Sequence, residues 1–142
     1  RRKAWTSQLC LQPLLAWKTK VIQVKKVRKG DSIGYNRTYK CTEDCQIAVL
    51  PLGYNEGYDR LLSNKGEVLI NGQACKIRGN ICMNLTMVEI PDGLDVEVGE
   101  VVTLLGTDSD QKISAEDIAS HCQTINYEIV TRINPSLERR IV

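Results

Sequence analysis

Tyrosines that follow glycines are the residues of this chain best suited to do chemistry. Tyr35 comes directly after Gly34, and Tyr54 and Tyr58 each follow a glycine in the segment Leu52–Arg60. A glycine lets the backbone turn sharply and leaves the neighbouring phenol on a loop, where binding and catalytic groups tend to lie. A phenol of ordinary pKa, about 10, is a poor base at neutral pH unless a cation or hydrogen bonds lower that pKa. The alternative interpretation is that these are half-buried tyrosines at the rim of a β-barrel, with wet hydroxyls.

Cysteine and histidine offer little for a metal site. There is no Cys-x-x-Cys, the only close pair among the six cysteines is Cys41 and Cys45, and His121 is the sole histidine. Structural zinc usually takes four such ligands from closely spaced pairs. A disulfide framework is not favoured either, because a chain of 142 residues can form a core without cross-links. We therefore expect no metal, and thiols that are buried and inert, Cys82 included.

The elements that must position the tyrosines are mostly β. In Glu67–Ile77, two short strands flank Asn71-Gly72, the pair best able to take the positive φ angles of a type I′ turn. This pattern predicts a hairpin. Further runs rich in Val, Ile and Thr, bounded by Gly, Pro and Asn, predict other strands. They cover residues 17–27, 46–50, 81–90, 100–105 and 125–133.

A single helix is predicted after Ser114. This serine can cap the helix, and Asp117 lies three residues on, near the positive end of the helix dipole. An apolar stripe follows on one face, formed by Ile118, Ala119 and Cys122. Many short strands and one short helix predict an all-β, or mainly β, fold, either a small β-barrel or a sandwich.

Length and composition point to one soluble globular domain. The chain has 142 residues, of which 42% are hydrophobic and 25% charged, which argues against intrinsic disorder. No apolar run approaches the roughly 20 residues that span a bilayer, and the basic start leads into no signal-peptide core. We expect a cytoplasmic protein that does not bind membranes. Because the chain begins with Arg1 and not Met, we also expect a domain excised from a longer protein.

Charge is unevenly distributed. The first 29 residues contain nine Lys and Arg and no acidic residue, whereas the rest carries ten basic and 17 acidic side chains. A basic arm could bind a polyanion, but alternation with apolar residues favours lysines on the solvent side of a strand. These are Lys18, Lys20, Lys25 and Lys26. Few aromatic residues lie nearby to stack bases, so we expect no nucleic-acid partner.

Five blocks of sequence carry a family resemblance. They are residues 34–39 (Gly-Tyr-Asn-Arg-Thr-Tyr), 47–60, 63–72, 79–87 and 124–130. In this order they resemble the carboxy-terminal domain of the bacterial alanine racemase family, which includes the serine racemases of vancomycin resistance. The resemblance covers residues 12–142 and implies a mainly β-barrel domain. Residues 1–11 are then expected to be a basic arm, the remnant of a link to a preceding (β/α)₈ barrel.

The resemblance implies an activity and a set of partners. Members of this family are homodimers that interconvert L- and D-alanine, which supplies D-alanine for peptidoglycan, and they use pyridoxal 5′-phosphate. The N-terminal barrel carries the lysine that forms a Schiff base with the cofactor. The C-terminal domain reaches into the active site of the second subunit and supplies a tyrosine as the opposite base.

Residue roles follow from the same resemblance. Tyr35 matches the catalytic tyrosine, and Met83 matches the methionine whose backbone N–H meets the substrate carboxylate. Tyr54, Arg60 and Asn84 match positions along the substrate entryway. Each of these residues lies within one of the five matching blocks.

Several positions depart from the family pattern. Asn80 stands where arginine is usual, Asn84 where aspartate is frequent, and Pro135 where some members have a tyrosine that touches the cofactor phosphate. None of the lysines lies in a segment like the family's cofactor-binding motif, so we expect the chain alone to be inactive. Two alternatives remain: a non-catalytic assembly or binding module with this fold, and a single-stranded nucleic-acid binder.

Overall fold

The structure is a computed structural model that describes residues 12–141. The basic arm predicted for residues 1–11, which includes Cys10, lies outside the described residues. The described strands are β1 (Trp17–Lys20), β2 (Gln23–Val27), β3 (Ser32–Ile33), β4 (Tyr39–Lys40), β5 (Cys45–Leu50), β6 (Glu67–Ile70), β7 (Gln73–Lys76), β8 (Thr86–Ile90), β9 (Val101–Asp108) and β10 (Gln111–Ile113). The helices are a 3₁₀ turn, η1 (Arg60–Leu62), and the α-helices α1 (Ala115–Cys122) and α2 (Asn126–Arg132).

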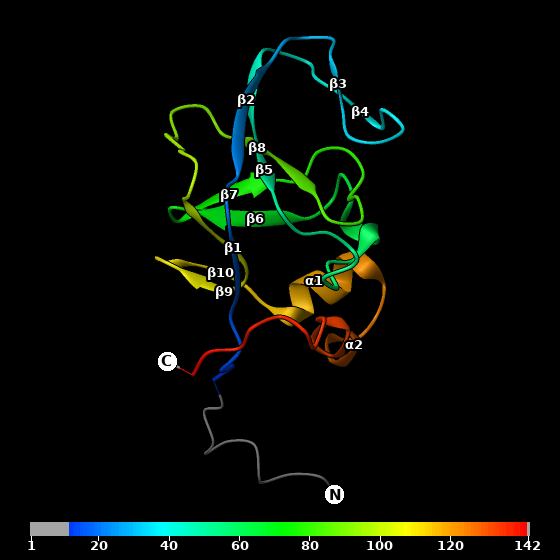
Figure 1. Ribbon diagram of the computed structural model, residues 1–142, viewed down its shortest axis with the longest axis vertical. Coiled ribbons are helices and arrows are strands. Elements are labelled where there is room, and N and C mark those ends of the chain that lie inside the picture. Colours follow the sequence, from blue (N-terminus) through cyan, green and yellow to red (C-terminus); the bar gives the residue numbers. More distant parts are fainter. Residues whose placement is uncertain (1–11, 142) are drawn as a thin grey trace, which may run out of the picture.

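The strands form two main antiparallel sheets and a small hairpin. One sheet has the order β1-β9-β6-β7, and β10 also pairs with β9. The second sheet has the order β2-β5-β8, while β3 and β4 pair only with each other. Figure 1 shows the β3–β4 hairpin at one end of the molecule and the two α-helices at the other end.

The strand predicted over residues 17–27 divides into β1 and β2 because the chain changes partners. The N–H of Val21 still donates to the residue before β9 (2.9 Å), whereas the N–H of Ile22 donates to β5 (3.0 Å). At the other edge, an isolated bridge between Ile77 and Val88 joins the end of β7 to β8. The two sheets therefore meet at both edges and surround the core. The predicted mainly β fold is confirmed.

The predicted hairpin is also confirmed. Its strands, β6 and β7, pair in register around Asn71 and Gly72. Both turn residues have positive φ angles, 49° and 74°, as a type I′ turn requires.

The strand predicted at residues 125–133 is wrong, because this segment forms α2. Ile, Tyr, Ile, Thr and Ile alternate along it and mimic a strand, yet only Ile129 and Ile133 are buried, one helical turn apart. Tyr127 is 71% exposed. The Thr131 hydroxyl donates to the carbonyl oxygen of Tyr127 over 2.9 Å, a bond typical of threonine within a helix. Residues 12–141 thus form two α-helices where one was expected.

The remaining predicted elements differ mainly in length. Helix α1 begins after Ser114 with the expected cap, and β5 and β9 lie where strands were predicted. The strand predicted over residues 81–90 is reduced to β8, because Cys82 donates its N–H to the Leu85 carbonyl oxygen and closes a turn. This turn belongs to the candidate site described below.

The core lies between the two sheets and the helices. Its largest fully buried side chains include Leu50, Tyr58, Leu62, Leu69, Ile70 and Leu104. The lysines of β1 and β2 are exposed, which confirms that they lie on the solvent side of these strands. No helix within residues 12–141 is long and apolar enough to cross a membrane.

The described cysteines are free thiols. Cys41, Cys75 and Cys122 are buried, as predicted, whereas Cys45 and Cys82 are only half-buried. Burial raises the pKa of Cys75 to about 12 and that of Cys122 to about 11. These two thiols therefore stay protonated at neutral pH.

Candidate functional site

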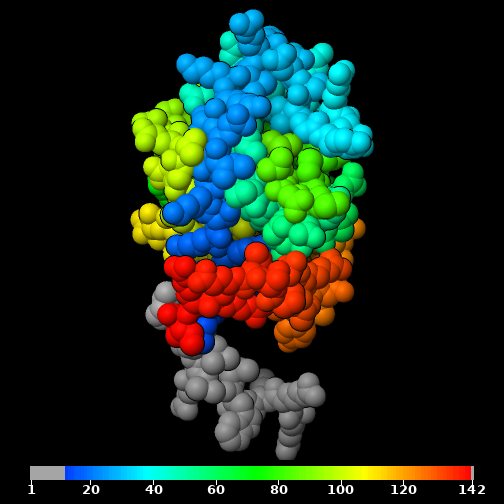
Figure 2. All heavy atoms as spheres, in the orientation of Figure 1, coloured from blue at the N-terminus to red at the C-terminus, as the bar shows by residue number. Residues whose placement is uncertain are grey.

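Three loops meet at an open groove of about 430 Å³. They are the turn between β3 and β4, the loop that leads from β5 to η1, and the loop between β7 and β8. Figure 2 shows these segments side by side on one flank of the molecule, in cyan, bluish green and green. The groove is lined by Tyr35, Asn36, Tyr54, Arg60, Asn80, Ile81, Cys82 and Met83. Four of the five predicted site residues are therefore brought together, and the fifth, Asn84, lies beside them and faces another group.

Tyr35 lies on a tight turn that exposes its phenol. The N–H of Arg37 donates to the Gly34 carbonyl oxygen (3.3 Å), and Asn36 has a φ of 63° at the turn position that requires a positive angle. Asparagine tolerates this conformation better than most residues. Tyr35 is 73% exposed, and its hydroxyl bonds to no other described residue.

Two glycines bring this turn against the loop that precedes β8. A Cβ at Gly34 would lie 3.0 Å from the Asn80 nitrogen, and a Cβ at Gly79 would lie 2.6 Å from the Ile33 oxygen. Both glycines have positive φ angles, 77° and 78°. Only glycine permits this close backbone contact, which fixes the turn that carries Tyr35.

The hairpin is also held to β8 by a charged cluster. Arg78 donates from Nε and Nη2 to the two carboxylate oxygens of Glu89, over 2.9 and 3.3 Å. Tyr39 donates its hydroxyl to the same carboxylate (3.1 Å), and the Arg78 guanidinium lies 4.4 Å from the centre of the Tyr39 ring. Burial, followed by the Glu89 charge, raises the pKa of Tyr39. This tyrosine is therefore a hydrogen-bond donor that anchors the hairpin.

Tyr54 and Met83 are placed by contacts between their two loops. Tyr54 donates its N–H to the Cys82 carbonyl oxygen (3.2 Å), and Asn55 donates to that of Met83 (3.0 Å). A Cβ at Gly53 would lie 1.9 Å from the Cys82 oxygen, so no larger residue fits there without a backbone shift. The Met83 N–H donates to no acceptor within residues 12–141. A residue that lines the groove thus carries a backbone donor that no described residue uses.

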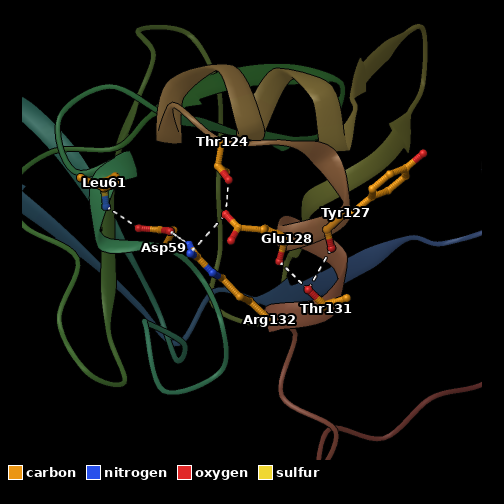
Figure 3. Close-up of polar contacts among 7 residues, drawn as sticks. All are labelled: Asp59, Leu61, Thr124, Tyr127, Glu128, Thr131 and Arg132. Carbon is orange, nitrogen blue, oxygen red and sulfur yellow. Dashed lines mark hydrogen bonds and ion pairs between the residues drawn. The ribbon is translucent and has the colours of Figure 1, made fainter.

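Arg60 begins η1 and is exposed. Asp59 accepts the N–H of Leu61 (2.8 Å) and so caps this turn, and its second oxygen accepts a hydrogen bond from Arg132 of α2. Figure 3 shows this link, in which Arg132 lies between Asp59 and Glu128. Arg60 itself forms no ion pair with a described residue.

Tyr58 and Asn84 have different surroundings from the other predicted residues. Tyr58 is buried and packs edge-on against Trp17, with ring centres 5.7 Å apart, so it is a core residue. Asn84 donates its side-chain amide to Glu56 (3.0 Å) and does not line the groove.

Polar residues that join the loops were missed by the sequence analysis. The Ser63 hydroxyl accepts the N–H of Ile81 (3.0 Å), and the Asn64 side chain accepts that of Gly79 (2.6 Å). The Glu56 carboxylate accepts the N–H of Gly53 in its own loop and the side-chain amide of Asn84 in the loop before β8. Each residue lies in a recognisable block beside a turn, but the sequence does not show which distant backbone group it will bond.

The groove can accept a small anionic ligand. Within residues 12–141, no acidic side chain lines it, and Arg60 is the only charged residue of the lining. Arg60 can attract a carboxylate, and the free Met83 N–H can bind one. The phenols of Tyr35 and Tyr54, which also line the groove, can donate hydrogen bonds or transfer protons.

The sequence of this chain is similar to alanine racemases over nearly its whole length. The profile of the family described as "Alanine racemase, C-terminal domain" matches residues 14–141. Alanine racemase from Halothermothrix orenii is 46% identical over 129 residues, which are 91% of this chain and 34% of that protein. The chain thus spans about a third of the length of the curated relatives it matches.

Solved structures show the same similarity. Alanine racemase from Bartonella henselae with covalently bound pyridoxal phosphate is 29% identical, with a TM-score of 0.76 over 82% of this chain and 32% of that chain. Histidine racemase from Leuconostoc mesenteroides is 33% identical, with a TM-score of 0.87 over 95% of this chain and 36% of that chain.

Proposed function

This chain belongs to the alanine racemase C-terminal domain family, and from this membership we propose that it supplies one side of an amino-acid racemase active site. The groove that gathers Tyr35, Tyr54, Arg60 and Met83 carries the proposal. Since the chain spans about a third of its relatives, the other two-thirds of such an enzyme would supply the rest of the site. We expect alanine as the substrate because the similar proteins are mostly alanine racemases.

The lining of the groove fits a site shared with pyridoxal phosphate and an amino acid. Among the described residues, the lining combines one cation without an ion-pair partner and one free N–H with no acidic side chain, which suits ligands that carry phosphate or carboxylate groups. The chain has no segment like the family's cofactor-binding lysine motif, so the cofactor would be held by the barrel domain. Pro135 is exposed and offers no polar side chain for a phosphate. When bound, the cofactor supplies the electron withdrawal that makes the α-proton of an amino acid removable.

Tyr35 would move a proton on one face of the substrate. Inversion of a stereocentre benefits from a proton acceptor on one face and a donor on the other, both held in place. The turn at Gly34 holds the Tyr35 backbone, and the phenol projects freely from it. Its Oη would take the α-proton of L-alanine or return a proton in the opposite direction.

Met83 and Arg60 would bind and orient the carboxylate of the substrate. The Met83 N–H has no acceptor among the described residues, and the Arg60 guanidinium has no ion-pair partner there. Tyr54, which also lines the groove, would limit the size of the amino acid that enters. A backbone donor at Met83 tolerates a change of side chain better than Tyr35 tolerates loss of its phenol.

The exposure of Tyr35 supports a second subunit as its partner. A catalytic phenol that is 73% exposed needs further protein to exclude water from the reaction. We infer a cytoplasmic homodimer in which this domain completes the site of the other subunit and the D-alanine produced serves peptidoglycan synthesis.

The test measures exchange of the α-proton of L-alanine into deuterated water with pyridoxal phosphate present. It compares the chain alone with a joined enzyme, in which the chain replaces the matching third of the Halothermothrix orenii relative. We expect exchange only in the joined enzyme, and its loss in the L-to-D direction with Tyr35→Phe. Tyr127→Phe is the matched control, since this tyrosine is equally exposed but lies on α2, outside the groove.

Two results would contradict the proposal. One is a joined enzyme without exchange while the unaltered relative is active, which would favour the assembly or binding module. The other is full activity of Tyr35→Phe. Serine and histidine tested in the same assay show whether alanine is the preferred substrate.

A further inference from the structure

Glu56 joins two of the three loops that form the groove. We propose that Glu56 is a positioning residue, whose carboxylate fixes the loop that carries Tyr54 to the loop that carries the Met83 N–H. The inference deepens the function proposed above and rests on it for its effect on catalysis. The link between the two loops can be measured without catalysis.

The Glu56 carboxylate accepts three hydrogen bonds. One oxygen, Oε2, accepts the backbone N–H of Gly53 over 2.8 Å. The other, Oε1, accepts the side-chain amides of Asn55 (2.9 Å) and Asn84 (3.0 Å). Gly53 and Asn55 belong to its own loop, whereas Asn84 lies 28 positions away in the loop before β8. One carboxylate therefore ties the two loops together.

These bonds also keep the carboxylate ionised. Partial burial alone would raise the pKa of Glu56, but the bonds from Asn55, Gly53 and Asn84 outweigh burial and lower it. Glu56 forms no ion pair with a described residue, so only neutral donors balance its charge. Hydrogen bonds to an ionised acceptor are stronger than neutral ones.

The backbone of the same residue is held from the opposite side. Asn134, which follows α2, donates its N–H to the Glu56 carbonyl oxygen (3.0 Å). The next residue, Gly57, packs so closely on α2 that a Cβ there would lie 2.2 Å from the Arg132 oxygen. The loop that carries Tyr54 is thus fixed between the C-terminal segment and the loop before β8.

This arrangement determines the direction of the Met83 N–H. The Cys82 carbonyl and the Met83 N–H belong to one trans peptide group, in which they point in opposite directions. Tyr54 donates to that carbonyl, so the Met83 N–H must point away from the loop that carries Tyr54. Glu56 supports this contact by holding Gly53 and Asn84, the residues next to Tyr54 and Met83.

The link between the two loops depends on asparagine at position 84 of this chain. Asparagine stands where the family often has aspartate, and here its amide donates to Glu56. With aspartate at this position, two carboxylates would lie within hydrogen-bond distance and repel each other. Glu56→Gln with Asn84→Asp exchanges donor and acceptor between the two positions, so the double variant can rebuild the link between the loops.

The first experiment measures amide hydrogen exchange by NMR on the 142-residue chain. We expect the Tyr54 and Asn55 amides to lose about tenfold of their protection in Glu56→Gln and in Asn84→Asp, the size of one charge-assisted hydrogen bond. In the double variant we expect protection within about threefold of the original. Glu43→Gln is the matched control, because Glu43 is exposed and bonds to no other described residue. Unchanged protection of the amides in the paired strands β5 and β8 shows that each variant is folded.

Exchange results of two kinds would overturn the inference. In one, both single variants keep the original protection at Tyr54 and Asn55. In the other, the double variant loses as much protection as the two single variants together.

The second experiment separates this inference from the proposed function. In the joined enzyme we expect Glu56→Gln to raise KM for alanine about tenfold and to leave kcat within about twofold, because it displaces a carboxylate-binding group and not the phenol. The double variant should recover KM. An inactive joined enzyme with the original sequence refutes the proposed function alone. An active one in which Glu56→Gln leaves KM unchanged refutes the effect of Glu56 on substrate binding.

Discussion

The side-chain amide of Asn80 donates a hydrogen bond to the carbonyl oxygen of Tyr35 over 3.2 Å. The two residues also form an isolated antiparallel bridge, and the Asn80 side-chain oxygen accepts the Thr38 hydroxyl (3.3 Å). Asn80 therefore contacts the turn of the proposed catalytic tyrosine at two positions, Tyr35 and Thr38. A residue that departs from the family's usual arginine has a structural role in this chain.

The first prediction concerns Asn80→Ala. Loss of its hydrogen bonds, worth about 1 kcal/mol net, should loosen the turn and lower kcat of the joined enzyme about fivefold. Amide exchange at Arg37, whose N–H closes the turn, should become faster. Asn126→Ala removes a comparable bond to Glu116 outside the groove and should leave kcat unchanged. Equal kcat values for the two variants would contradict this role.

The second prediction concerns the contact between Gly53 and Cys82. Gly53 does not have a positive φ, so alanine is excluded by the lack of space alone. Gly53→Ala should force the two loops apart and lower the free energy of unfolding by about 2–3 kcal/mol, as overpacking does. Gly30→Ala, where φ is 92° and no atom lies within 4 Å, should cost only about 1 kcal/mol for backbone strain. Urea unfolding compares the two, and an equal cost would show that the loops separate easily.

Local signals made the hairpin at β6–β7 predictable, because Asn71 and Gly72 specify its turn without help from the rest of the chain. The same reasoning failed for α2. Its alternating residues satisfy a strand pattern, and the buried pair Ile129 and Ile133 satisfies a helical one. Packing against α1 and the loop at Gly57 selects the helix, and a local pattern contains neither contact.

The candidate site could likewise be predicted only in part from the sequence. Tyr35, Tyr54, Arg60 and Met83 could be found from motifs, and the structure brings them to one groove. The role of Glu56 could not be found, because it depends on a hydrogen bond of 3.0 Å between the Asn84 amide and the Glu56 carboxylate, which belong to different loops. The family resemblance places Asn84 in the entryway by position alone, and only the fold shows that its amide points to Glu56.

The third prediction concerns the pH dependence of the α1 cap. Bonds from the Ser114 hydroxyl and backbone N–H (2.6 and 2.8 Å) lower the pKa of Asp117. A carboxyl with a lowered pKa in the folded state stabilises that state above its unfolded pKa, about 3.9, and loses this effect as pH falls through the folded value. Asp117→Asn should lower the free energy of unfolding by about 0.5–1 kcal/mol at pH 7, and the difference should shrink as pH falls from about 3.9 through the lowered pKa of the folded state.

The control for this prediction is Asp95→Asn, since Asp95 is exposed and bonds to no other described side chain or backbone group. Its urea midpoint should match that of the original chain at every pH tested. A difference between Asp117→Asn and the original chain that does not shrink as pH falls below about 3.9 would show that the cap does not depend on ionisation.

The last prediction concerns the ion pair between Arg132 and Asp59. The Asp59 side chain is only 13% exposed, and its two oxygens join α2 to η1, the turn that begins at Arg60. Arg132→Ala would leave this carboxylate without its cation, so the free energy of unfolding should fall by about 1–2 kcal/mol. Because η1 then loses its support, KM for alanine in the joined enzyme should rise while kcat changes little.

The pair of Arg140 and Glu138 provides the comparison, since its side chains are 77% and 72% exposed. Exposed pairs contribute little, so Arg140→Ala should change the free energy of unfolding by less than about 0.5 kcal/mol. Arg132→Lys keeps the charge but loses the planar guanidinium, and should recover part of the stability. If Arg132→Ala costs no more than Arg140→Ala, α2 does not support η1. The position of Arg60 must then depend on Ser63, whose hydroxyl donates to the Arg60 carbonyl oxygen and accepts the N–H of Ile81.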